Sequence, residues 1–374
     1  MAFDIVIIRV LVFVLGVALV AGTLISAIRT FVLPRSAQDP LTRVVFLTMR
    51  RLFFFRLRWA RTYAERDQVL ALYAPISLLA LPPTWLTLVL LGYMGMYWAL
   101  GVPAWNAFRA SGSSLLTLGI ETVSDLPGTI LMFSEATIGL GLVALLIAYL
   151  PTMYSAFSQR ESLVTMLEVR AGSPPSAVEM IKRYQRFHGL DRFSELWVAW
   201  EVWFAELEES HTSLPALAFF RSPQPDHSWV TASGAVMDAA SLLTAVVDAP
   251  LDPRAILCIR AGYLALRRIS DFFAIPYNPD PRYPADPISV TREEFEAACD
   301  QLAAQGVPLK PDRDQAWRDF AGWRVNYDRV LLALCSITTA PHAPWSSDRA
   351  PQYRNPPLFR LGRKPGQRPV PPPA

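Results

Sequence analysis

The sequence predicts an all-α membrane protein with three transmembrane helices, a short re-entrant helix and loop between the second and third, and a helical cytoplasmic domain. Three observations lead to this prediction. Apolar residues make up 52% of the 374 residues and charged residues only 18%, so the chain is more apolar than a typical soluble protein. Nearly all of the apolar excess precedes residue 157, while most charged residues follow it. In the second half, apolar residues recur at helical spacing.

The first apolar run extends from residue 10 to 28 without a charge. At about 1.5 Å per residue it nearly crosses a hydrocarbon core of about 30 Å. Only Arg9 precedes this long run closely, whereas a cleaved signal peptide has a basic start and a shorter apolar stretch. We therefore expect a retained transmembrane helix.

The second uncharged run, residues 69–102, contains Pro75, Pro82 and Pro83. Because proline breaks the hydrogen-bond ladder of a helix, we expect an interfacial or kinked lead-in followed by a span from about Pro83 to Leu100. The third run, residues 126–157, has a single charge at Glu135 and is expected to form the last span.

Arginines set the expected orientation. Residues 34–69 carry eight arginines against three acids, whereas the loop between the second and third runs has one, Arg109. We expect the protein in the plasma membrane. The positive-inside rule then places the arginine-rich segment and everything after residue 157 in the cytoplasm, and the N-terminus outside. The stretch "RLFFFRLRWAR" is also compatible with nucleic-acid binding, but its interleaved aromatic residues favour a helix at the lipid surface, so a nucleic-acid partner is not expected.

Between the second and third runs lies "VPAWNAFRASGSSLLTLGIETVSDL". Residues 105–116 can form a short helix, and the residues after it are small, polar or extended. Extended chain inside a membrane leaves backbone carbonyls unpaired unless protein buries them or they line a water-filled path. Carbonyls that line such a path can replace the water shell of a cation.

The stretches "AFRASGSSLLTLGIETVSD" and "LMFSEATIGLGLVALLIAYLPTMYSAFSQRE" resemble the pore loop and inner helix of the potassium-channel-type pore-loop family. In that family a Ser-x-x-Thr pattern leads to Thr-Val-Gly-Tyr-Gly-Asp. Ser111 and Ser114 match the hydroxyl residues of the pore helix, and Thr117, Leu118 and Gly119 match the start of the filter. The resemblance covers about residues 83–160 and implies a homotetramer with an ion filter on its axis.

The filter departs from the family pattern at its end. Ile120 stands where the family has an aromatic residue, and Glu121 stands where it has a second glycine. Since glycine tolerates positive φ where other residues resist it, the upper carbonyl layers are not expected to form as usual. The stretch also resembles cyclic-nucleotide-gated cation channels, which place Glu-Thr after Thr-Ile-Gly; here Ile120 intervenes. In a tetramer this implies a ring of four Glu121 carboxylates, which favours cations and can hold divalent ions.

The third run carries further candidate residues. Glu135 is an ionisable group within an apolar helix, a costly placement that usually has a function; we expect a structural hydrogen bond behind the filter. Gly139 and Gly141 suit either close helix packing or a bend on gating, and Pro151 can kink the same helix. The stretch "GLGLVA" also fits the dinucleotide-binding fingerprint, but that motif requires a preceding strand, and here it lies within an expected transmembrane helix.

The second half shows no glycine-rich phosphate loop, no paired metal ligands and no nucleophile elbow. We therefore expect no enzyme activity, no cofactor and no metal centre, and Trp197, Trp200 and Trp203 are expected in the core. The chain divides into a first transmembrane helix (1–33), an arginine-rich interfacial segment (34–69), a pore module (70–157), a helical cytoplasmic domain (158–340) and a disordered proline-rich tail (341–374).

These observations predict passive conduction of monovalent or divalent cations through a homotetramer in the lipid bilayer, with altered selectivity and gating by the cytoplasmic domain. Two alternatives remain open. One is a potassium-selective channel. The other is a membrane-anchored sensor or scaffold with a non-conducting, pore-like hairpin.

Overall fold

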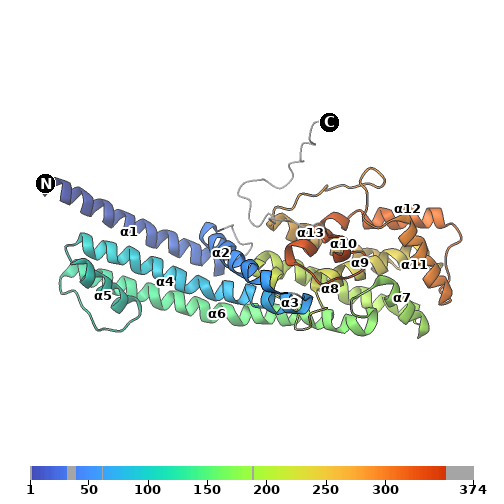
Figure 1. Cartoon of the computed structure of the whole chain (residues 1–374), viewed down its shortest axis with the longest axis horizontal. Helices are drawn as coiled ribbons and strands as arrows, with labels where there is room; N and C mark the ends of the chain where they lie inside the picture. The colour runs from blue at the N-terminus through green and yellow to red at the C-terminus, as the bar shows by residue number, and fades with distance from the viewer. Residues whose placement is uncertain (1, 32–38, 61, 188, 351–374) are drawn as a thin grey trace. The chain divides into compact units, whose positions relative to one another are not determined.

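A computed structural model describes residues 2–31, 39–60, 62–187 and 189–350. The regular structure in these ranges is helical (Figure 1), with one isolated bridge between Val247 and Leu309. The all-α class is therefore confirmed. The chain forms two compact units: unit 1 comprises Met1–Arg56 and Leu72–Ser155, and unit 2 comprises Leu57–Ala71 and Ala156–Ala374.

Several helices are long and apolar enough to cross a membrane, which indicates a membrane protein. They lie in Phe3–Phe31, Glu65–Ala99, Leu126–Ala171 and Trp229–Val246. In the first three, 11–39% of the most apolar window is buried, whereas in Trp229–Val246 the buried share is 89%. An all-apolar helix is either a membrane span or a core helix, and the burial of Trp229–Val246 identifies it as the core of unit 2.

Unit 1 contains α1 (Ala2–Phe31), α2 (Pro40–Arg56), α4 (Tyr73–Ala99), α5 (Ala104–Leu115) and the first part of α6 (Leu126–Ala171). Small residues bring α1 and α4 together: a Cβ at Gly16 would stand 2.6 Å from the carbonyl oxygen of Gly92. Such close approach is typical of helices packed in membranes. A buried hydrogen bond of 3.0 Å from Trp85 Nε1 to Ser26 Oγ joins the same helices.

The span expected from about Pro83 is part of a longer helix, because α4 begins at Tyr73 and includes Pro82 and Pro83. A break within an apolar environment would leave more backbone groups unpaired than the two prolines do. Hydroxyls of this stretch bond back to the helix, since Thr84 Oγ1 donates to the Ala80 carbonyl and Thr87 Oγ1 to the Pro83 carbonyl.

The last apolar helix also extends further than expected. α6 runs without interruption through Pro151 and past residue 157 to Ala171, where its final turns belong to unit 2. Proline removes one backbone hydrogen bond but leaves the rest of a long helix intact. One continuous helix thus contributes to both units.

Unit 2 is a helical domain. Its core holds the predicted tryptophans Trp197, Trp200 and Trp203, each at most 2% exposed. A capping box begins α11, with Thr291 at the N-cap and Glu294 as its partner. The helices are α3 (Tyr63–Ala71), α7 (Ala177–Arg186), α8 (Phe193–Ser213), α9 (Trp229–Val246), α10 (Pro253–Phe272), α11 (Arg292–Ala304), α12 (Arg313–Arg324) and α13 (Asp328–Thr338).

Two features of unit 2 differ from expectation. Helical spacing of apolar residues continues through residues 313–337, but the helix is broken between Arg324 and Asp328. Residues 341–350, expected at the start of a disordered tail, are packed: Arg349 pairs with Glu294 at 2.8 Å, and the Trp345 carbonyl accepts from Arg324 at 2.5 Å. The expected tail boundary at 341 therefore lies too early, and residues 351–374 lie outside the described part of the chain.

A buried cluster holds the end of α6 within unit 2. Arg160 pairs with Glu161 and donates to the carbonyls of Leu217 and Phe220 at 2.8 Å. Its guanidinium also lies 3.2 Å from Nε2 of His211, whose Nδ1 lies 3.0 Å from the Leu207 carbonyl. The contacts require Nδ1–H to donate and Nε2 to accept, so the imidazole is neutral. Burial, with the nearby Arg160 charge, holds the pKa of His211 well below its ordinary value.

Candidate functional site

The candidate site is built on α5, the short helix that follows α4. Apart from Leu115 at its last position, the residues that α5 buries are small: Ala107, Ala110, Ser111, Ser113 and Ser114. Small side chains allow the close approach of neighbouring helices, as in other membrane bundles. The segment expected to form a short re-entrant helix is therefore helical and lies against α4 and α6 within unit 1.

Glu135 of α6 ties the helices of the site together. It is fully buried and accepts hydrogen bonds from Ser111 Oγ at 2.5 Å and from the Tyr97 hydroxyl at 3.3 Å. Ser111 Oγ also lies 3.0 Å from the Leu90 carbonyl of α4. A buried carboxyl is tolerated only with such partners. Ser114 is buried beside this network, and its hydroxyl has no hydrogen-bond partner among the described residues.

The two glycines of α6 have different surroundings. A Cβ at Gly139 would stand 2.2 Å from the Leu115 carbonyl oxygen, so this position lets α6 pack on the last residue of α5. Gly141 meets nothing within 4 Å and lines an apolar hollow between α1 and α6. The geometry thus gives Gly139 a packing role, while Pro151 lies further along within the continuous helix.

Ser113 shapes the loop that follows α5, a role that the sequence reasoning missed. Its Oγ accepts hydrogen bonds from the backbone N–H groups of Ile120 and Glu121, both at 3.0 Å. Thr117 and Gly119 have positive φ angles of 54° and 68°. The loop therefore turns back on the end of α5 and is fixed there by a buried hydroxyl.

The backbone carbonyls of residues 117–121 accept no hydrogen bond from any residue in the described ranges. The side chains of Thr117, Leu118 and Ile120 are exposed in the single chain. Unpaired carbonyls are costly away from water and need water, a cation or another chain as partner. These five consecutive carbonyls without hydrogen-bond partners are therefore potential ligands of a cation.

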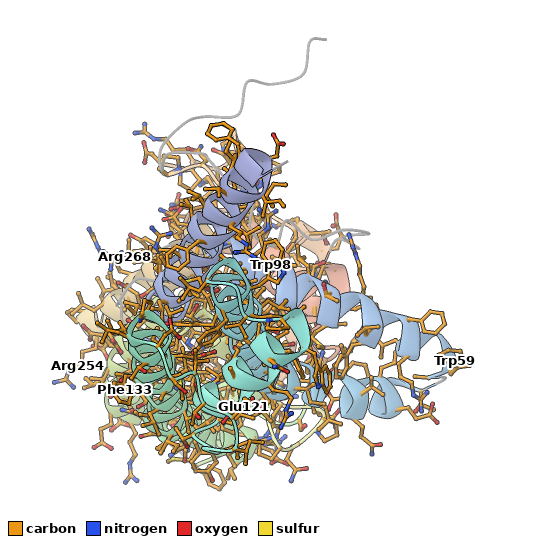
Figure 2. The ribbon with its side chains drawn as sticks, turned by 90° about the vertical axis from the view of Figure 1, so that its left-hand side faces the viewer. Trp59, Trp98, Glu121, Phe133, Arg254 and Arg268 are labelled. Carbon is orange, nitrogen blue, oxygen red and sulfur yellow. The ribbon has the colours of Figure 1, made fainter. Side chains whose placement is uncertain are left out.

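Glu121 does not stand free at the end of this loop. Its carboxylate lies 2.9 Å from the guanidinium of Arg109, and both side chains are partly exposed. Figure 2 shows Glu121 beside α5, the helix that carries Arg109. The carboxylate expected to contribute to a charge ring thus has a cation of its own chain as neighbour.

Metal-binding side chains do not gather in the described ranges: no group of three or more His, Cys, Asp or Glu residues could hold an ion there. Cys258, Cys299 and Cys335 are buried and free. No family model matches the sequence, and no match was found among curated proteins or solved structures.

Proposed function

We propose that the protein conducts cations passively across a membrane, through a pore lined by residues 117–121 of four identical subunits. The observation that carries this proposal is the row of five backbone carbonyls without hydrogen-bond partners in the described chain. Carbonyl oxygens at close quarters replace the hydration shell of a cation. α5 ends at Leu115, directly before this row, and the C-terminal end of a helix carries partial negative charge that favours cations.

The support for a ring of subunits is the exposure of apolar residues at the loop. Leu118 is 57% exposed and Ile120 is 69% exposed in the single chain. A pore on one axis requires closed rotational symmetry, and a fourfold ring would surround each loop with its copies. In this arrangement α1, α4 and α6 cross the bilayer, residues 34–69 and unit 2 lie in the cytoplasm, and the loop after α5 opens to the outside.

Selectivity in this proposal departs from that of a potassium filter. Thr117, Leu118 and Gly119 supply carbonyl oxygens, whereas Glu121 ends the row in place of a glycine. Arg109 offsets the charge of Glu121 within each subunit. The outer mouth is therefore less acidic than four free carboxylates would make it, and we expect a weakly selective cation pore with modest sensitivity to divalent ions.

A flux assay tests the proposal. Full-length protein in liposomes loaded with a thallium-sensitive dye should admit Tl⁺, and empty liposomes should not. Ser113→Ala removes the acceptor of two loop N–H groups and should lower flux about tenfold, while Ser124→Ala on the exposed part of the loop should not. Parent protein that assembles normally but admits no Tl⁺ would contradict the proposal and favour a sensor or scaffold.

A further inference from the structure

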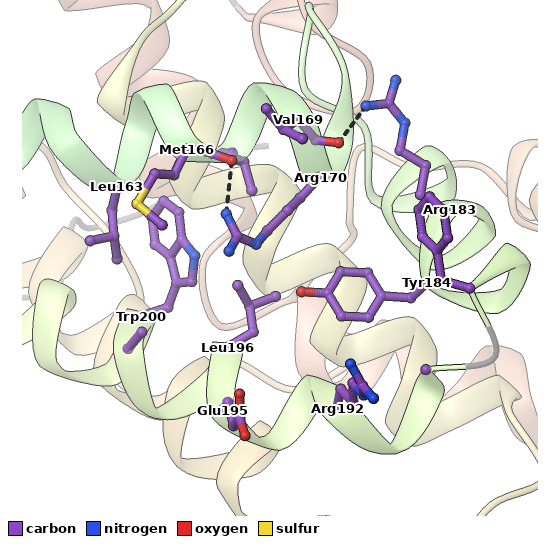
Figure 3. A pocket seen from close by; sticks show the side chains of 14 residues that line it. Leu163, Met166, Val169, Arg170, Arg183, Tyr184, Arg192, Glu195, Leu196 and Trp200 are labelled. Carbon is purple, nitrogen blue, oxygen red and sulfur yellow. Dashed lines mark hydrogen bonds between the residues drawn. The ribbon is translucent and has the colours of Figure 1, made fainter.

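Unit 2 contains a pocket between the last turns of α6 and helices α7 and α8 (Figure 3). Its volume is about 620 Å³, which lies within the range of small-molecule sites. Leu163, Met166 and Leu196 form an apolar wall, and Arg170, Arg183 and Tyr184 supply polar groups.

Hydrogen-bond donors converge on this pocket without acceptors. The Trp200 side chain is 1% exposed, and its indole N–H borders the pocket without a hydrogen bond to another described residue. Figure 3 shows this nitrogen on the side of the ring that faces the Arg170 guanidinium, and shows the Tyr184 hydroxyl pointing into the same space. That hydroxyl likewise has no partner in the described ranges. By contrast, the comparably buried Trp203 donates to the Arg160 carbonyl at 3.0 Å.

The donors are held in place by packing. The Tyr184 ring is stacked on Phe193 with centroids 3.9 Å apart. Trp200 packs edge-on against Trp203 at 4.6 Å. Arg170 uses one nitrogen for the Met166 carbonyl at 3.0 Å, and its other nitrogens have no described partner. Donors fixed in this way lose little conformational freedom when an acceptor binds between them, which favours binding of a ligand with an acceptor group.

The charge around the pocket is positive. Three arginines line it, Arg170, Arg183 and Arg192, against the carboxylate of Glu195 at the rim. Arg183 is offset by Glu179 at 2.9 Å, whereas Arg170 and Arg192 have no carboxylate within 4 Å among the described residues. A cationic, donor-rich end beside an apolar wall fits an anion with an apolar body.

We propose that this pocket binds a small organic monocarboxylate, with the carboxylate at Trp200 Nε1, Tyr184 Oη and the Arg170 guanidinium, and the apolar body against Leu163, Met166 and Leu196. Carboxylate oxygens accept such donors in charge-assisted hydrogen bonds. Because α6 forms one wall, occupancy also acts on the helix that crosses the membrane; this regulatory consequence rests on the proposed conduction, whereas the binding itself does not.

Isothermal titration of full-length protein in nanodiscs with 4-phenylbutyrate tests the site, with empty nanodiscs as blank. We expect saturable binding that is about tenfold weaker in Tyr184→Phe, Trp200→Phe and Arg170→Met, a loss of about 1.4 kcal/mol each. Tyr263→Phe and Arg254→Met, which lie outside the pocket, should bind like the parent.

Two comparisons make the test decisive. The neutral alcohol 4-phenylbutanol should bind at least tenfold more weakly than the carboxylate, and 3-phenylpropyl phosphate should not bind better. Equal binding of the alcohol, tighter binding of the phosphate, or unchanged affinity in Tyr184→Phe and Arg170→Met would overturn the proposal. These two variants alter the pocket edge, so they stay informative if Trp200→Phe unfolds. Binding without ion flux would leave the site intact and refute only the conduction.

Discussion

The two units of the molecule differ in how far their apolar helices are buried. In the apolar part of α6, large apolar side chains such as Phe133 (Figure 2) and Ile147 are exposed, while the carboxyl of Glu135 is fully buried. In unit 2, α9 is also long and apolar enough to cross a membrane but buries nearly all of its side chains. Hydropathy alone therefore does not separate a membrane span from a core helix. The environment of each helix does, because lipid accepts apolar surface and water does not.

The buried carboxyl groups of the two units also differ in the partners that satisfy them. In unit 1, neutral donors, the hydroxyls of Ser111 and Tyr97, satisfy Glu135. In unit 2, Arg324 is paired with Asp238 at 2.5 Å and with Asp328 at 2.8 Å. Although burial alone would lower it, these carboxylates raise the pKa of Arg324 above its ordinary value. The unit 2 cluster thus depends on a full ion pair.

Arg324→Met is expected to have the largest effect. It leaves Asp238 and Asp328 buried without their cation, which costs about 3–5 kcal/mol of the free energy of unfolding. Urea unfolding of the full-length protein, followed by tryptophan fluorescence, measures the loss. The control is Arg268→Met, because Arg268 pairs with Glu208 at a partly exposed site and such pairs contribute about 1 kcal/mol at most. Equal losses in the two variants would show that the buried cluster does not stabilise unit 2.

Gly139→Ala is expected to have an intermediate effect in unit 1. Its Cβ would overlap the Leu115 carbonyl, and the resulting strain should cost about 1–3 kcal/mol. Gly141→Ala is the matched control, since it meets open space and alanine favours the helix by about 1 kcal/mol. Thermal unfolding in nanodiscs should lower the midpoint only for Gly139→Ala. A lower midpoint for both variants, or for neither, would argue against the contact between α5 and α6.

The smallest expected effect is the pH dependence from His211. Its pKa is lowered in the folded protein, chiefly by burial, whereas the unfolded chain has the ordinary value of about 6.5. Above that pH the imidazole is neutral in both states. Below it the unfolded chain binds the proton first, so stability falls by up to about 1.4 kcal/mol per pH unit.

His211→Gln should therefore flatten the loss of stability between pH 6.5 and 5.5. His342→Gln, at an exposed position, should keep the slope of the parent. Urea midpoints across this pH range provide the measurement. A parent slope that survives in His211→Gln would assign the pH dependence to other groups.

Much of the helical architecture followed from the sequence, because long apolar runs and helical spacing are local signals. The short helix α5 and the buried tryptophans of α8 belong to this class. The continuation of α4 through Pro82 and Pro83 was not predicted from the sequence. Local rules predict a break at proline, whereas the cost of unpaired backbone groups in an apolar environment favours continuation.

The details of the site depended on contacts that a sequence does not display. A structural hydrogen bond of Glu135 behind the filter was expected, but its partners were not. The loop contacts of Ser113 and the pairing of Arg109 with Glu121 arise only once the chain turns back after α5. The donors at Tyr184 and Trp200 were likewise invisible, because each residue alone has the pattern of an ordinary core position.

Bilayer recording of the purified full-length protein under a KCl gradient measures conduction itself. We expect discrete currents that reverse near the equilibrium potential of the cation. Glu121→Gln should reduce the preference for cations over anions, and Glu195→Gln in unit 2 should not. Currents that reverse near the chloride potential, or a correctly assembled protein without currents, would contradict the assignment of residues 117–121 as a cation pathway.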